Sequence, residues 1–133
     1  MLGSRTILIV DGSTYAALDL AAAVEDNDGC VAGPVATLSE ALAILDSHDI
    51  AGAIVDCGLP EASALIVRLA DSGVPLVVQT SIPLPPALDR LDGRLSMLMR
   101  PADPRTIIDK LVGQIGKAAL RAGNKLGSGY KQV

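Results

Sequence analysis

Aromatic side chains are nearly absent from this sequence. Its 133 residues include no tryptophan, no phenylalanine and only two tyrosines, Tyr15 and Tyr130. A core must therefore be built from Leu, Ile, Val and Ala, and because half of the residues are apolar there is enough material for one domain. Base stacking on aromatic rings, the usual device for binding single-stranded nucleic acid, is almost excluded.

Acidic residues are absent from the chain after Asp109. Residues 1–109 carry 15 acids and 6 bases, a balance of −9, whereas residues 110–133 carry 5 bases and no acid. The acidic body would repel phosphate backbones, and the basic end is too short and too rich in glycine to form a DNA-binding domain. The charge distribution therefore predicts no nucleic-acid partner.

Long apolar runs and an N-terminal targeting segment are also missing, so the sequence predicts no membrane-spanning segment. The two cysteines, Cys30 and Cys57, occur without a secretory signal, which is typical of proteins from a reducing compartment. We therefore expect a cytoplasmic protein. The thiol of Cys57 has no basic neighbour in the sequence and is expected to be inert.

Runs of buried-strand type alternate with helix-like stretches along the chain. Strands are expected at 6–11, 30–36, 51–56, 74–81 and 94–101, and helices at 13–29, 37–48, 61–73 and from 104 onward. The prolines between 83 and 86 allow at most two helical turns near 87–92. The apolar period fades after about Leu120, which predicts a domain of residues 1–120 followed by a disordered, basic C-terminal tail of residues 121–133.

The order of these elements predicts the fold class. Thr37 with Glu40 forms a capping box at the start of the second helix, and Asp103 followed by Pro104 marks the start of the last one. Five β–α units without a linker predict a single α/β domain, a doubly wound five-stranded parallel sheet with helices on both faces. Such sheets bind ligands at the carboxyl ends of their strands.

Polar side chains follow four of the expected strands where each strand ends. They are Asp11, Asp56, Thr80 with Ser81, and Arg100. Two carboxylates at one edge repel each other unless a cation lies between them, and Mg²⁺ prefers such oxygen ligands. A hydroxyl and a fixed positive charge suit the oxygens of a phosphoryl group in transfer. The edge therefore predicts a metal-assisted phosphoryl site with a carboxylate nucleophile.

Four segments resemble, in order and spacing, the signature strands of the receiver domains of bacterial response regulators. They are ILIVDG, VDCGLP, VVQTS and LMRPADP, and the resemblance covers roughly residues 5–115. The stretch GCVAGPVATLSEAL is also similar to a subgroup of small receivers with a V-x-G-P segment in the second strand. The resemblance implies a flavodoxin-like (β/α)5 fold with strand order 2-1-3-4-5, and a signalling protein rather than an enzyme.

The resemblance also implies roles for individual residues. Asp56 matches the aspartate that accepts the phosphoryl group, and the backbone carbonyl of Gly58 matches a Mg²⁺ ligand. Thr80 matches the hydroxyl that contacts the phosphoryl group. Asp11 matches the first member of an acidic pair that, with Asp56, holds the metal. Arg100 stands where the family has a lysine that is usually followed by a cis peptide bond.

Three residues depart from the pattern of that family. Gly12 stands in place of the second acid of the pair, so we expect Mg²⁺ affinity to fall by roughly 10–100-fold. Arg100 replaces lysine with a planar and bulkier group that could clamp Asp56 in its unmodified state. Met97 stands where many receivers carry a switching Tyr or Phe, so any output must use another element.

Two functions remain open at this stage. The first is a stand-alone receiver in a two-component phosphorelay, which takes a phosphoryl group on Asp56 from a histidine kinase or phosphotransfer protein. It would act on a downstream protein target, and the face of its last two helices is compatible with a homodimer. The alternative is a degenerate receiver that binds partners independently of phosphorylation. A small enzyme is disfavoured, because there is no glycine-rich phosphate loop after the first strand and no aromatic to hold a flavin.

Each site residue also has a simpler explanation. Asp56 could cap the turn that follows its strand, and Asp11 could cap the first helix. Thr80 could satisfy the backbone of a loop, and Arg100 could be a solvated charge at a strand end. The prediction of a site therefore depends on whether folding brings these side chains together.

Overall fold

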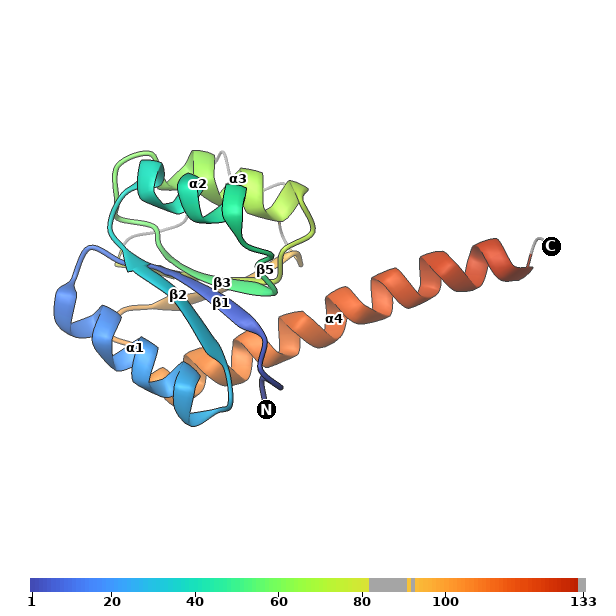
Figure 1. Ribbon diagram of the computed structural model, residues 1–133, viewed down its shortest axis with the longest axis horizontal. Coiled ribbons are helices and arrows are strands. Elements are labelled where there is room, and N and C mark those ends of the chain that lie inside the picture. Colours follow the sequence, from blue (N-terminus) through green and yellow to red (C-terminus); the bar gives the residue numbers. More distant parts are fainter. Residues whose placement is uncertain (82–90, 92, 132–133) are drawn as a thin grey trace.

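The computed structural model describes residues 1–81, 91 and 93–131, the last nine of these for their backbone only. The described chain forms strands β1 (Thr6–Val10), β2 (Cys30–Val35), β3 (Gly52–Asp56), β4 (Leu76–Thr80) and β5 (Leu95–Met99), and helices α1 (Thr14–Asp26), α2 (Leu38–Ser47), α3 (Ala62–Asp71) and α4 (Pro104–Lys131) (Figure 1). Strands and helices alternate as the sequence predicted from β1 to β4, and α4 follows β5. The short helix expected near 87–92 falls largely outside the described residues.

All five strands lie in one parallel sheet in the order β2-β1-β3-β4-β5. This is the doubly wound, flavodoxin-like arrangement with the strand order that the resemblance implied. The chain moves outward in opposite directions from β1 and from β3, so the two strands flank the switch point. Their carboxyl ends, which carry Asp11 and Asp56, therefore meet where such folds bind ligands.

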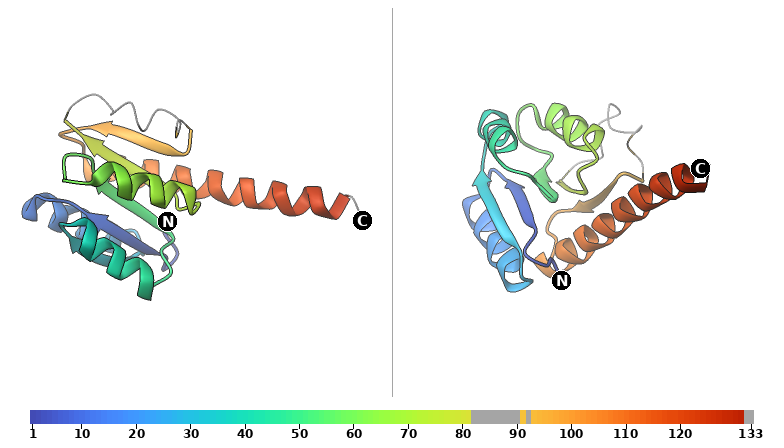
Figure 2. Two further views of the ribbon diagram at one scale, coloured as in Figure 1. Left: turned by 90° about the horizontal axis from the view of Figure 1, so that it is seen from above. Right: turned by 45° about the vertical axis from the view of Figure 1, so that its right-hand side comes forward.

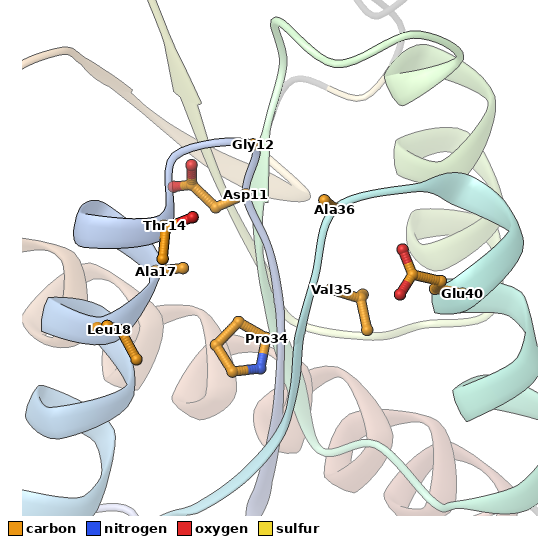
Figure 3. Close-up of a pocket in the computed structure, with 9 residues that line it drawn as sticks. All are labelled: Asp11, Gly12, Thr14, Ala17, Leu18, Pro34, Val35, Ala36 and Glu40. Carbon is orange, nitrogen blue, oxygen red and sulfur yellow. The ribbon is translucent and has the colours of Figure 1, made fainter.

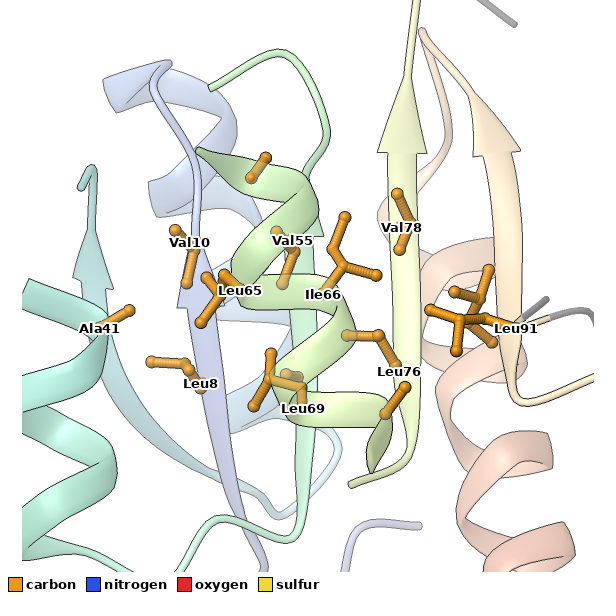
Figure 4. Packing of buried hydrophobic residues seen from close by; sticks show 14 of the residues in the cluster. Leu8, Val10, Ala41, Val55, Leu65, Ile66, Leu69, Leu76, Val78 and Leu91 are labelled. Atoms are coloured by element: carbon orange, nitrogen blue, oxygen red, sulfur yellow. The ribbon is translucent and has the colours of Figure 1, made fainter. Parts of the chain in front are cut away.

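Helices cover both faces of the sheet, with α2 and α3 on one side and α1 and α4 on the other (Figure 1). Side chains of β1 alternate between these layers: Leu8 and Val10 pack under α2 and α3, whereas Ile7 and Ile9 pack under α1 and α4. The centre of the first layer is formed by Leu65 and other aliphatic side chains of α3 (Figure 4). Burial on both faces explains why the strands read as continuous apolar runs.

The helix starts follow the capping signals in the sequence. The amide of Glu40 donates to the hydroxyl of Thr37 (3.2 Å), and the amide of Arg105 donates to the carboxylate of Asp103 (2.8 Å). Pro104 is the first residue of α4, as predicted. These side chains satisfy amides that the first turn of a helix leaves without a partner.

Strand β2 lies at one edge of the sheet and is distorted at Gly33 and Pro34, which are joined by a cis peptide bond. Its pairing with β1 shifts register between Leu8 and Val10. Gly33 has φ +96°, and a Cβ there would lie 2.8 Å from the amide nitrogen of Val35 and 3.0 Å from the carbonyl oxygen of Ile9. Only glycine fits this backbone, which accounts for the glycine of the GPV segment.

Helix α4 continues well past the sheet (Figure 2). Its helical backbone runs to Lys131, and the domain boundary at residue 120 with a disordered tail, which the fading apolar period predicts, stays a prediction. Among the described residues, no helix is long and apolar enough to cross a membrane.

Candidate functional site

Three charged side chains from distant parts of the chain meet at the carboxyl edge of the sheet. The Nη2 atom of Arg100 donates to Oδ2 of Asp11 at 2.9 Å and lies 3.4 Å from Oδ2 of Asp56. The side chain of Asp11 is 0% exposed, that of Asp56 17% and that of Arg100 23%. Folding thus brings together two carboxylates and one guanidinium, as the sequence predicted. The nearer partner of Arg100 is Asp11 rather than Asp56.

Backbone amides complete the surroundings of Asp56. The amide of Gly58 donates to Oδ1 of Asp56 at 2.9 Å, and the amide of Gly12 donates to Oδ2 at 3.4 Å. Two backbone amides therefore donate to this carboxylate, and the guanidinium of Arg100 forms an ion pair with it. They hold Asp56 at the end of β3 with part of its surface open to solvent.

Asp11 is held more tightly than Asp56. Its Oδ1 accepts a hydrogen bond from the amide of Ser13 at 2.8 Å, and its Oδ2 accepts one from Arg100. Its own amide donates to the carbonyl oxygen of Val35 at 2.9 Å. Asp11 therefore holds the turn before α1 and the ion pair at once, but the N-cap of α1 is Ser13, whose hydroxyl accepts from the amide of Ala16. The role of Asp11 in a metal or phosphoryl site stays a prediction.

Thr80 ends β4 at the same edge of the sheet. Its carbonyl oxygen accepts a hydrogen bond from the amide of Arg100 at 2.9 Å, and its side chain is buried. The peptide bond between Arg100 and Pro101 is cis, as the resemblance implied. The backbone contact fixes where Arg100 leaves the sheet, and the role of the Thr80 hydroxyl toward a phosphoryl group stays a prediction.

Gly12 stands where receiver domains, which this sequence resembles, have the second acid of a pair, and here the side chain of Leu59 covers it. A Cβ at Gly12 would lie 2.8 Å from Cδ2 of Leu59 and 3.8 Å from Oδ2 of Asp56. Any larger residue at position 12 would therefore require Leu59 to move. The contact between Leu59 and Gly12 joins the loops that follow β1 and β3, so it forms only when these two strands are adjacent and could not be predicted from the sequence.

The arrangement does not fit a divalent cation well. The resemblance implies Mg²⁺ held by Asp11, Asp56 and the carbonyl of Gly58, but Arg100 already contacts both carboxylates. No group of three or more His, Cys, Asp or Glu side chains that could hold a metal occurs among the described residues. A Mg²⁺ ion would have to share these carboxylates with a guanidinium, which repels it.

A pocket of about 290 Å³ opens beside Asp11, between the start of α1 and the end of β2. Figure 3 shows side chains of α1, among them Thr14 and Leu18, on one side of this pocket and Glu40 of α2 on the other. Pro34 of the distorted edge strand forms part of its wall. The pocket therefore leaves the candidate site open to solvent on the side of Asp11. Its lining is mostly apolar, and its polar side chains are Asp11, Thr14 and Glu40.

Expectations from the sequence also concerned Cys57 and Met97. Burial, and secondarily the charge of Asp56, raise the pKa of the Cys57 thiol. Cys57 is therefore protonated at neutral pH, in keeping with an inert thiol. Met97 of β5 is half-buried and packs against the core layer under α2 and α3.

A buried side-chain amide beside Asp56 was not predicted from the sequence. Gln79 of β4 pairs with Asp56 in the sheet register and is buried. Its Nε2 atom has no hydrogen-bond partner within the part of the chain that the structure describes. The polar residue within the apolar run VVQTS was the available signal.

Comparison with solved structures places this fold among receiver domains. It is similar to a response regulator receiver domain protein from Methanospirillum hungatei JF-1, with a TM-score of 0.77, 20% identity, and coverage of 88% of this chain and 98% of that one. It is also similar to a response regulator receiver protein from Sinorhizobium medicae WSM419, with a TM-score of 0.72, 20% identity, and coverage of 89% and 99%.

A third similar structure is the signal receiver domain of a modulated diguanylate cyclase from Desulfovibrio desulfuricans G20, with a TM-score of 0.75, 23% identity, and coverage of 88% of this chain and 98% of that one. No family model matches the sequence, and no curated protein sequence matches it significantly. At these identities the likeness establishes the receiver fold, and the function has to be argued from the site.

Proposed function

We propose that this protein is a two-component receiver that accepts a phosphoryl group on Asp56 and signals through protein contacts. The observation that carries the proposal is the position of Asp56, a partly exposed carboxylate at the end of β3. It accepts hydrogen bonds from the amides of Gly12 and Gly58 and forms an ion pair with Arg100. A nucleophile with open space in front and fixed donors around it is what phosphoryl transfer to a carboxylate requires.

The transfer step uses residues described above. One carboxylate oxygen of Asp56 attacks the phosphorus of a phosphohistidine on a histidine kinase or phosphotransfer protein. A P–O bond to Asp56 forms while the P–N bond of the donor breaks, and the electron pair of that bond stays with the imidazole nitrogen. Arg100 and the amides of Gly12 and Gly58 face the phosphoryl oxygens, and the Thr80 hydroxyl is proposed to contact one of them.

The charge of the site changes in this step. An ionised carboxylate with one negative charge becomes an acyl phosphate with about two. Arg100 contacts both Asp11 and Asp56 before the step, so the added charge shifts the balance between its two ion pairs. We propose that this redistribution alters the surface offered to a downstream protein, which makes the protein a signalling domain rather than an enzyme. The proposed location is the cytoplasm, where such kinases donate phosphoryl groups.

Phosphorylation is tested by incubating the purified protein with a small phosphodonor, acetyl phosphate or phosphoramidate, and measuring its intact mass. We expect an adduct of about 80 Da, the mass of one phosphoryl group, that is absent in Asp56→Asn. Asp46→Asn, which removes an acid from α2 away from the site, is the matched control and should keep the adduct.

Failure to form the adduct with either donor or with a kinase would contradict the proposal. The alternative of a phosphorylation-independent interaction module would then be tested by partner binding, which Asp56→Ala should leave unchanged.

A further inference from the structure

We propose that Arg100 takes the place of the divalent cation at this site, so that Asp56 is phosphorylated without Mg²⁺. The inference deepens the proposed function and rests on it for the reaction, although the occupation of the site can be tested separately. It starts from the disagreement between the residues present and the magnesium site that the family resemblance implies.

The positive charge of Arg100 can relieve the repulsion between Asp11 and Asp56 in place of a metal ion. A divalent ion between two carboxylates relieves their repulsion, and here Nη2 of Arg100 does so, at 2.9 Å from Asp11 and 3.4 Å from Asp56. The guanidinium is covalently attached to the chain, so this cation cannot dissociate as a metal ion can. The fully buried carboxylate of Asp11 depends on it, because a buried charge needs a partner.

The space beside Gly12 is also unfavourable for a metal-binding carboxylate. The resemblance places a metal-binding acid at position 12, where this chain has glycine, and Leu59 occupies the volume beside it. A Cβ at Gly12 would approach Cδ2 of Leu59 to 2.8 Å. Mg²⁺ demands nearly octahedral oxygen ligands, and this chain has lost one carboxylate while an apolar side chain covers its position.

Arg100 also has hydrogen-bond donors left for a phosphoryl group. A guanidinium carries five N–H donors in one plane, more than its ion pairs with Asp11 and Asp56 use. That geometry matches two oxygens of a phosphoryl group. The neighbouring amides of Gly12 and Gly58 already point at Asp56. The site therefore has a complete set of donors made by the chain alone.

Occupation of the site is tested without any phosphodonor, by adding Mn²⁺ as a paramagnetic probe and recording amide NMR spectra. In the native protein we expect no selective broadening of the amides of residues 11–13 and 56–58. In Arg100→Gln the two carboxylates are freed, and selective broadening should appear. The melting temperature of this variant, unlike that of the native protein, should rise with Mg²⁺.

A second variant keeps the test informative if Arg100→Gln does not fold. Gly12→Asp combined with Leu59→Ala rebuilds the acidic pair and removes the side chain that blocks it. We expect this double variant to bind Mn²⁺ at least about tenfold more tightly than the native protein. Selective broadening in the native protein, or its absence in every folded variant, would overturn the inference.

The reaction itself is tested with acetyl phosphate in the presence of EDTA or of Mg²⁺. We expect the native protein to form the Asp56 adduct at the same rate in both. An adduct that forms only with Mg²⁺ would overturn the inference while supporting the proposed function. The absence of an adduct under both conditions would contradict the proposed function, and the Mn²⁺ experiment would still decide which cation occupies the site.

Discussion

The Nη2 atom of Arg100 lies 2.9 Å from Oδ2 of Asp11, and this ion pair joins residues 89 positions apart in the sequence. The carboxylate is fully buried, whereas the guanidinium is partly exposed. The ion pair connects the carboxyl end of β1 to that of β5. The carboxylate of Asp56, at the end of β3 between these two strands, also contacts Arg100.

The first prediction concerns the stability that this pair provides. Arg100→Gln leaves the buried carboxylate of Asp11 without its charged partner and should lower the free energy of unfolding by about 2 kcal/mol. The measurement is urea denaturation followed by circular dichroism. As a control, Asp71→Asn breaks the 3.8 Å pair with Arg94, in which both side chains are about half exposed, and should cost less than about 1 kcal/mol. Equal costs for the two variants would contradict the role given to burial.

The second prediction contrasts two glycines. Gly33→Ala meets backbone atoms at 2.8 and 3.0 Å with φ +96°, and should cost about 2 kcal/mol. Gly12→Ala meets only the end of the Leu59 side chain, which can rotate, and should cost about 1 kcal/mol or less. In Leu59→Ala the added cost of Gly12→Ala should disappear. The free energies of unfolding of the three single variants and the double variant test this, and strict additivity would argue against the Gly12–Leu59 contact.

The third prediction concerns the pH dependence of Cys57. Its pKa is raised mainly by burial and then by the charge of Asp56, so Asp56→Asn should lower that pKa without returning it to the ordinary thiol value. The rate of alkylation against pH, measured by mass spectrometry in a Cys30→Ser background, reports the change. An unchanged profile would mean that the carboxylate of Asp56 is not felt at the sulfur.

The raised pKa of Cys57 also determines how the free energy of unfolding changes with pH. A raised thiol pKa means that folding favours the protonated form. This contribution is fully present below the ordinary thiol pKa and is lost as the pH rises from that value through the raised pKa of the folded state. Cys57→Ser should remove this alkaline loss, which urea denaturation at neutral and alkaline pH would show.

The fourth prediction concerns the end of α4. The buried residues of this helix within its described part, Ile107, Ile108, Leu111 and Gln114, all precede residue 115. Removing residues 121–133 should therefore reduce helical circular dichroism but change the free energy of unfolding by no more than about 0.5 kcal/mol. A large loss of stability would place the domain boundary later than the sequence predicts.

Much of this architecture could be predicted because local signals and the global fold agree. The apolar runs mark strands that are buried on both faces, and Thr37 and Asp103 cap the helices that they precede. The polar residues at the strand ends converge because parallel strands share one edge. Asp11, Asp56 and Arg100 were found by this argument alone.

Features that depend on contacts between distant segments could not be predicted. The cover of Leu59 over Gly12 exists only once β1 and β3 are paired. The preference of Arg100 for Asp11 over Asp56 is decided by where the side chains lie in three dimensions. The extent of α4, whose helical backbone runs to Lys131, could not be predicted from an apolar period that fades after about Leu120.

Asp11, Asp56 and Arg100, the three charged residues of the site, each lie shortly before the start of a helix. Asp11 comes just before α1, Asp56 before α3 and Arg100 before α4, and these helices lie on opposite faces of the sheet. A change of charge at one carboxylate can therefore reach both surfaces of the molecule through three short connections. Such a layout offers a route for output that does not need an aromatic ring at position 97.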